Sequence, residues 1–237
     1  MIYDEFVLIS RMVHLNDFAR EIERGHEGHD PWSKVRFLLD KVNLMAKRYY
    51  TPSRYIGIDE SMIDMKNRLI FIQFMPNKRH ARFGIKKFQL CDNNGYVIHV
   101  DLYSGKELDV QHSEGQAFGV VEKLLRESQL LFKGFHLFTD NYYTKPKLGE
   151  YLLERDTLLT GTVRHNSKGV PENVFRKIDV GVTQFWRKNN GGMLALAFRE
   201  KKSKLKPVLA LSTAHKAGVE ERRIRGKDVK KLNVHYL

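Results

Sequence analysis

The sequence predicts a mixed α/β fold, in which helices flank a sheet that contains both antiparallel and parallel strands. Apolar residues recur at helical spacing through residues 2–49. From Tyr55 the period changes to short strand-like runs. After Ser113, two helical segments alternate with such runs, as they do where parallel strands are joined. The class is therefore α/β, with an N-terminal helical segment.

Two helices are expected before the first strand. The first lies within residues 2–21, where Ile2, Phe6, Ile9 and Val13 share one face. Asp30-Pro31 is a plausible N-cap and first-turn proline for the second, which should end near residues 49–50. Five apolar residues of the second helix are expected to be buried: Val35, Leu38, Leu39, Val42 and Met45.

The polar segment 24–30 between these helices has two interpretations. Its histidines and acids, His26, Glu27, His29 and Asp30, are of metal-ligating types. A glycine-punctuated loop between two helices is the preferred interpretation.

Two apolar runs end in an acid. Ile56 and Ile58 lead into Asp59, and the run Phe135–Thr139 is followed by Asp140. Desolvating a carboxylate costs several kcal/mol unless a cation or hydrogen bonds compensate it. If the two strands lie side by side, their aspartates could hold divalent cations on a phosphate. Glu60, Asp92 and Asp101 are interpreted as turn or surface acids.

The segment between these acids is predicted to contain a hairpin. The runs Lys86–Cys91 and Tyr96–Tyr103 flank Asp-Asn-Asn-Gly at 92–95, a strong turn signal. Leu69–Met75 is a further extended run. A helix with a Ser113/Gln116 capping box and a helix capped by Thr144 follow. An antiparallel hairpin feeding a helix and then a parallel neighbour is the ribonuclease-H-like arrangement.

The last third of the sequence has a different pattern. Short strand-like runs are expected at 174–178, 183–187, 193–198 and 207–211, with Asn189–Gly192 as a hairpin tip. They predict a small β-rich insertion that is separate from the first sheet. From Arg199 to Lys231 the chain holds 12 Lys and Arg against 4 Asp and Glu, a net +8.

Overall charge points to a polyanionic partner. The 237 residues carry a formal net charge of +13, which is typical of nucleic-acid-binding chains, although a merely soluble basic protein is the alternative. One cysteine, Cys91, excludes a disulfide framework and a thiolate zinc site, and it fits a reducing compartment. No run of eighteen apolar residues appears, so no membrane partner is expected.

Several blocks resemble the piggyBac family of transposases, and together they cover nearly the whole chain. They are Tyr50–Arg54, Ile58–Met62, Met75–His80, Phe83–Lys86, Leu137–Thr144, Tyr151–Arg155, Gly161–Arg164, Lys168–Pro171 and Leu211–His215. The resemblance implies a ribonuclease-H-like DDE domain that cuts and rejoins DNA with two divalent ions, Mg²⁺ or Mn²⁺. Asp59 matches the first catalytic, metal-holding aspartate of the family and Asp140 the second. Transposon ends, TTAA target sites, a possible homodimer and a nuclear location are also implied.

The chain departs from the family at its third acid. In the family, a Gly-Gly-Val-Asp type sequence follows the point that matches residues 235–237, and these 237 residues contain none. Asp179 and Asp228 are weak substitutes, and no cysteine-rich zinc-binding tail is present, so zinc is not expected. The reaction is therefore expected to be incomplete in this chain. The alternatives are a non-catalytic DNA-binding or scaffold protein derived from a transposase, and a truncated fragment.

The expected organisation has four parts. Residues 1–50 are a helical segment matching part of the family's DNA-binding and dimerisation region, and 51–165 are the core with the first two acids. Residues 166–215 are the β-rich insertion, and 216–237 are a basic segment leading toward the last part of the core. Eleven residues are predicted to contact DNA: Arg79, His80, Arg82, Lys86, Arg199, Lys201, Lys202, Lys204, Arg222, Arg223 and Arg225.

Overall fold

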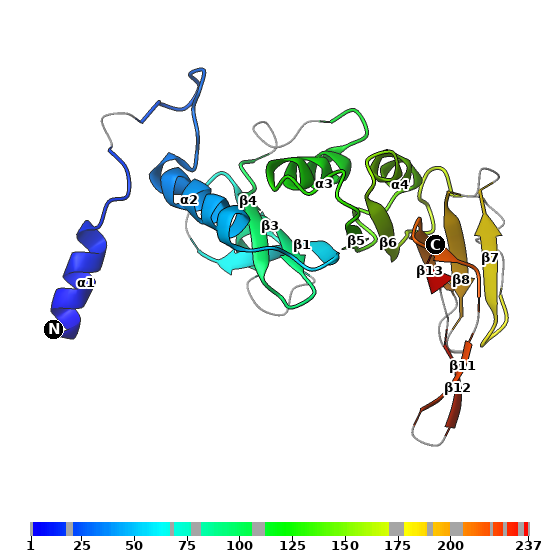
Figure 1. Cartoon of the computed structure of the whole chain (residues 1–237). Helices are drawn as coiled ribbons and strands as arrows, with labels where there is room; N and C mark the ends of the chain where they lie inside the picture. Colours follow the sequence, from blue (N-terminus) through cyan, green and yellow to red (C-terminus); the bar gives the residue numbers. More distant parts are fainter. Residues whose placement is uncertain are drawn as a thin grey trace. The chain divides into compact units, whose positions relative to one another are not determined.

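The chain forms two compact units. Figure 1 shows the computed structural model of the whole chain. The first comprises residues 1–51, 60–89 and 97–109, and the second comprises 52–59, 90–96 and 110–237. The structure describes residues 2–17, 21–66, 69–76, 82–105, 112–170, 178–188, 192–199, 206–218, 220–224, 227–231 and 235–236, with side chains as far as Gly218. Two long strands, β1 (Tyr55–Asp64) and β3 (Phe83–Asp92), have residues in both units.

The first unit combines two helices with antiparallel strands. Its helices are α1 (Tyr3–Met12) and α2 (Ser33–Tyr49). Strand β2 (Ile72–Phe74) pairs antiparallel with the start of β3, and β4 (Val97–Leu102) also pairs with β3. The predicted run Leu69–Met75 is therefore only partly a strand.

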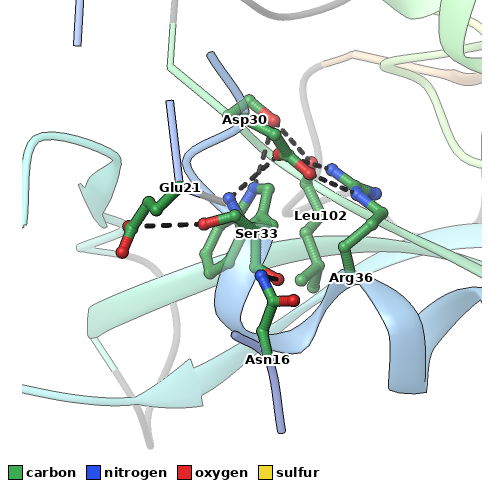
Figure 2. A network of polar contacts seen from close by, with 8 residues as sticks. Asn16, Glu21, Asp30, Ser33, Arg36 and Leu102 are labelled. Carbon is green, nitrogen blue, oxygen red and sulfur yellow. Dashed lines mark hydrogen bonds and ion pairs between the residues drawn. The ribbon is translucent and has the colours of Figure 1, made fainter. Parts of the chain in front are cut away.

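Helix α2 begins at a polar network. The carboxylate of Asp30 accepts the backbone N–H of Trp32 at 2.9 Å and pairs with Arg36 Nε at 2.7 Å (Figure 2). The Arg36 guanidinium lowers the pKa of Asp30 from its usual value. Trp32 itself is buried against Phe71, with ring centroids 4.1 Å apart. The prediction that Asp30 and Pro31 form the N-cap and first turn of α2 is wrong, because Trp32 is the N-cap and the helix begins at Ser33. Asp30 instead stabilises the turn before the helix, in agreement with the loop interpretation of segment 24–30.

The predicted burial of the α2 face is wrong. Ala46 is the buried residue of this helix, whereas Leu38 is 48% and Val42 52% exposed. The reason is that this apolar face borders a groove instead of packing against a closed layer. Helix α1 is also shorter than predicted. It ends at Met12, because Val13 takes an extended conformation, and none of its residues is buried.

The predicted hairpin between β3 and β4 is confirmed. Asp92 is a turn acid, as interpreted: its Oδ1 accepts the backbone N–H groups of Asn94 at 2.9 Å and Tyr96 at 3.1 Å. Gly95 adopts φ 83°, a conformation that favours glycine. The assignment of Asp101 to the surface is wrong, since Asp101 is only 6% exposed and both faces of β4 are covered.

One side chain of α2 binds the backbone of β4. Asn43 Nδ2 donates to the carbonyl of Val100 at 2.9 Å, and its Oδ1 accepts the N–H of the same residue at 2.9 Å. The amide of Asn43 therefore satisfies both backbone groups of Val100 as a neighbouring strand would.

The second unit is organised around parallel strands. Residues 55–58 of β1 pair in parallel with β5 (His136–Thr139), which pairs in parallel with β6 (Leu158–Thr162). Helix α3 (Gln116–Glu127) precedes β5, and α4 (Pro146–Leu153) joins β5 to β6. Helix α3 buries an apolar face that includes Phe118, Val121, Leu124 and Leu125.

The predicted helix caps differ from those observed. Gly115, at φ 95°, occupies the N-cap of α3, so the Ser113/Gln116 capping box does not form. Lys145 precedes α4 and Pro146 is its first residue, so Thr144 is not its N-cap. In both places the chain enters its helix one or two residues later than the polar pattern indicates.

The strands of the β-rich segment extend the sheet of the second unit. Strand β9 (Val208–Ser212) pairs antiparallel with β6, β8 (Leu194–Phe198) with β9, and β7 (Thr183–Arg187) with β8. The prediction that they stand apart from the first sheet is wrong, because the edge of β6 offers backbone groups that need partners. The predicted tip at residues 189–191 and most of the run 174–178 lie outside the described residues.

Two short ladders complete the described strands. Strand β10 (His215–Lys216) pairs antiparallel with β13 (His235–Tyr236), and β11 (Glu220–Ile224) pairs with β12 (Lys227–Lys231). Among the described helices, none is long and apolar enough to cross a lipid bilayer.

Candidate active site

The two predicted acids lie on neighbouring strands of the second unit. The parallel ladder of β1 and β5 places Ile58 opposite Thr139, and Asp59 and Asp140 are the residues that follow this pair in the chain. Adjacent strands run about 4.8 Å apart. Both aspartates are exposed. The same edge of the sheet therefore presents both carboxylates to solvent, as the hypothesis of a shared site requires.

One detail of the prediction is corrected. Asp59 does not end its strand, because β1 continues to Asp64. The continuation pairs with β3, where Ser61 hydrogen-bonds to Gln89. Asp59 instead marks the point at which β1 leaves the parallel ladder with β5.

The loop after β5 fixes the orientation of Asp140. Its Oδ1 accepts the backbone N–H of Tyr142 at 2.9 Å and that of Tyr143 at 3.4 Å. Tyr143 is fully buried and anchors this turn. Thr144 closes it, since its hydroxyl donates to the carbonyl of Asp140 at 2.7 Å and its backbone N–H to the same oxygen at 3.0 Å. The carboxylate is thus held by backbone groups before any ligand binds.

Gly161 on β6 allows this turn to lie close to the sheet. A Cβ atom at residue 161 would overlap the hydroxyl of Thr144 and the carbonyl of Thr139. The hydroxyls of these two threonines are 2.7 Å apart. Only glycine leaves room for this contact, so Gly161 positions the Asp140 turn although it lies on another strand.

A cationic side chain lies beside the same turn. Arg164 Nε donates to Asn141 Oδ1 at 3.1 Å, and its guanidinium carbon is 5.6 Å from the centroid of the Tyr142 ring. The Tyr142 hydroxyl donates to Gln116 Oε1 at 2.8 Å, which connects the turn to α3. Asp140 therefore has a guanidinium group in its immediate neighbourhood.

The two aspartates supply some of the ligands that a hard divalent cation requires. Carboxylate oxygens are the ligands that Mg²⁺ and Mn²⁺ prefer, and Asp59 and Asp140 supply one carboxylate each. Within the described residues, no group of three or more His, Cys, Asp or Glu side chains is placed to hold a metal ion. The two aspartates fit as two members of a larger carboxylate set.

Comparison with known proteins places the chain in a family. The model of the family described as Transposase IS4, of the DDE type, matches residues 1–236. The chain belongs to the piggyBac-type DDE transposases. DDE transposases generally use divalent metals.

Individual relatives agree with this assignment. Human PiggyBac transposable element-derived protein 3 is 29% identical over 166 residues, which are 68% of this chain and 26% of that protein. The human chimeric ERCC6-PGBD3 protein is 29% identical over the same length, which is 15% of its own chain. This chain thus spans about a quarter of the length of the first relative.

A solved structure confirms the ribonuclease-H-like fold. The chain matches a piggyBac transposase synaptic complex with hairpin DNA at a TM-score of 0.82 and 26% identity, over 96% of this chain and 46% of that one. The mixed sheet with few helices is therefore the DDE transposase fold.

Three of the residues predicted to contact DNA have side chains that the structure describes. Arg82 is exposed just before β3, Lys86 Nζ is 4.7 Å from the Phe88 ring centroid, and Arg199 donates to the carbonyl of Ile178 at 3.2 Å. The side chains of the remaining residues are outside the described part: Arg79, His80, Lys201, Lys202, Lys204, Arg222, Arg223 and Arg225. Their role in binding DNA stays a prediction.

The chain also contains a buried polar cluster that the sequence did not indicate. His136 Nε2 lies 2.8 Å from Thr160 Oγ1, which lies 2.7 Å from Ser212 Oγ, which is 2.6 Å from His215 Nδ1. His136 is fully buried, and burial, His215 and Arg54 lower its pKa to about 4. The cluster joins β5, β6, β9 and β10, and its residues are too far apart in sequence for local spacing to reveal it.

Proposed function

We propose that this chain is part of the DNA-cleaving and strand-joining core of a piggyBac-type transposase, and that Asp59 and Asp140 are the first two of its three metal-holding acids. Their placement on neighbouring strands, at the point where the parallel ladder of β1 and β5 ends, is the observation that supports this proposal. The solved relative is titled as a complex with DNA, which supports DNA as the partner. Transposon ends, TTAA target sites, a homodimer and a nuclear location follow from the family resemblance.

The side chains around Asp140 support a role in binding a DNA phosphate. Divalent cations held by the aspartates would neutralise charge on the phosphate and activate the attacking oxygen. Asp140 is already oriented by the N–H groups of Tyr142 and Tyr143, so little reorganisation accompanies binding. Arg164 supplies a positive group beside the turn for a backbone phosphate. The basic segment 199–231 adds phosphate contacts that are independent of base sequence.

We infer that these 237 residues bind DNA and a divalent cation but do not cut. The Gly-Gly-Val-Asp sequence that carries the third acid in the family does not occur in them. Loss of one member of a set that acts as a unit removes most of its catalysis. A non-catalytic DNA-binding role is therefore the second candidate function, and it differs from the first in the outcome of one assay.

The experiment combines cation binding with strand cleavage. Binding of Mn²⁺, followed by its electron paramagnetic resonance signal, should weaken about tenfold in Asp59→Asn and in Asp140→Asn. Glu154→Gln, which removes a largely exposed acid at the end of α4, should leave binding unchanged. A transposon-end duplex should remain uncut with Mg²⁺.

Two results would contradict these proposals separately. Mn²⁺ binding that survives both aspartate substitutions would remove Asp59 and Asp140 from the metal site. Mg²⁺-dependent nicking that Asp59→Ala abolishes would show that the chain is an active nuclease, and it would overturn the inference that these residues do not cut.

A further inference from the structure

Two exposed aromatic rings are stacked across the β2–β3 ladder of the first unit. Phe74 on β2 is the register partner of Phe83 on β3, and their ring centroids lie 4.5 Å apart with 28° between the ring planes. The cross-strand pair stabilises the ladder. Phe74 is nevertheless 55% and Phe83 49% exposed. The pair therefore leaves flat apolar surface in contact with water, where another molecule can stack on it.

The rings are attached to a part of β3 that has hydrogen bonds on both sides. The backbone N–H of Met75 donates to the carbonyl of Arg82 at 2.8 Å, which extends the ladder with β2. The N–H of Met65, just after β1, donates to the carbonyl of Phe83 at 3.3 Å. Ile85, the next residue on the same face of β3, is buried. The pair is thus held in place before a ligand binds, which lowers the ordering cost of binding.

The charge next to the pair favours a polyanion. Residues 75–82, which join β2 to β3, include Lys78, Arg79 and Arg82 and contain no Asp or Glu. At the end of β1, Asp64 and Lys66 are both exposed and balance each other in charge. A flat aromatic surface beside a surplus of cations is the combination that binds single-stranded nucleic acid, in which bases stack on the rings and cations contact phosphates.

We propose that Phe74 and Phe83 form a stacking platform for unpaired bases of DNA. In a duplex, both faces of a base are covered by its neighbours, so a ring at the protein surface stacks only on a base that has left the duplex. The platform therefore recognises a single-stranded segment without reading its sequence. The proposal rests on DNA as the partner in the proposed function, but not on Asp59, Asp140 or strand cleavage.

Binding to single-stranded and duplex DNA by the 237-residue chain tests the platform. Fluorescence anisotropy compares a labelled oligothymidylate with a labelled duplex of the same length. Phe74→Leu and Phe83→Leu remain apolar but lose the flat ring, so each should raise the dissociation constant for the single strand about tenfold. Affinity for the duplex should stay within about twofold, which also shows that the variants fold.

Two further variants serve as controls. Phe74→Tyr keeps a flat ring and should retain the affinity for the single strand. Phe37→Leu changes a phenylalanine of α2 that is 70% exposed and lies outside the β2–β3 ladder, and it should leave both affinities unchanged.

Photochemical cross-linking locates the contact. An oligothymidylate that carries one 5-iodouracil should cross-link on irradiation to Phe74 or Phe83, as mapped by mass spectrometry of the digested chain. A chain that binds neither form of DNA would overturn the platform together with DNA as the partner. Tight binding of the single strand that both Leu variants leave intact, an equal loss for single strand and duplex, or cross-links that map only to other residues would overturn the platform alone.

Discussion

Helices α3 and α2 have similar patterns in the sequence and different environments in the fold. Each shows apolar residues at the spacing of an amphipathic helix. In α3 this face is covered, and Val121, Leu124 and Leu125 have no exposed surface. In α2 the face borders the groove, and Ala46 is the buried residue. An apolar stripe therefore indicates that a helix needs a partner surface, but it does not say whether the same chain provides one.

The difference also separates the candidate metal site in the second unit from the exposed apolar surface of the first. The second unit encloses its apolar residues under α3 and α4, which keeps the strands that bear Asp59 and Asp140 in register. The first unit exposes apolar surface on both α1 and α2. A rigid support suits a metal site, and an exposed apolar face suits association with another molecule.

The largest effect is expected from shortening a side chain under α3. Leu124→Ala removes a fully buried side chain and leaves a cavity, so it should lower the free energy of unfolding by about 3 kcal/mol. Urea denaturation measures this change. Leu153→Ala at the end of α4, where the side chain is 39% exposed, is the control and should cost far less. A loss below about 1 kcal/mol in Leu124→Ala would show that α3 is not packed as described.

A somewhat smaller effect is expected from pH. Burial lowers the pKa of His136 from 6.5 to about 4, with His215 and Arg54 acting in the same direction. The neutral ring is therefore favoured in the fold, and its contribution is fully present above pH 6.5 and is lost as the pH falls toward 4. This difference corresponds to at most about 3 kcal/mol. Burial lowers the pKa of His215 as well, so the neutral form of this ring is also favoured in the fold.

Comparing the chain with His136→Gln separates the contribution of His136 from that of carboxylates, which titrate in the same pH range. From pH 7 to pH 4.5, the urea midpoint of unfolding should fall more in the unmodified chain than in the variant. Equal falls in both proteins would mean that His136 is protonated in the fold, or that the cluster does not stabilise β5 against β6.

The smallest effect is expected on the exposed face of α2. Leu38→Ala should change the unfolding free energy by no more than about 0.5 kcal/mol in dilute solution, because the side chain already contacts water. A loss of several kcal/mol in dilute solution would mean that the groove is closed within one chain.

The features that local chemistry determines were predictable from the sequence. The turn at 92–95 needs Asp92 and a glycine in a left-handed conformation, and both occur. Strand β5 and the Asp140 that follows it correspond to a short apolar run followed by an acid. Placing Asp59 beside Asp140 required only that two strands separated by a hairpin and a helix become parallel neighbours. The candidate site was accordingly the most predictable part of the fold.

The features that depend on distant partners were not predictable. Gly161 lies close to Thr144 because β6 pairs with β5, and nothing in the neighbouring residues indicates that contact. Strands β7 to β9 join the sheet through the edge of β6, whereas their own pattern suggested a separate layer. The exposure of Val42 likewise depends on what lies opposite α2. Local periodicity shows which face is apolar, and tertiary pairing decides its neighbour.

The amide of Asn43 has a consequence for solubility. In the described part of the chain, β4 pairs with β3, and an unprotected strand edge invites pairing with other molecules. Asn43 occupies the donor and the acceptor of Val100, so an incoming strand finds no free pair at the middle of β4. A helix side chain therefore protects the middle of β4 from pairing with further strands.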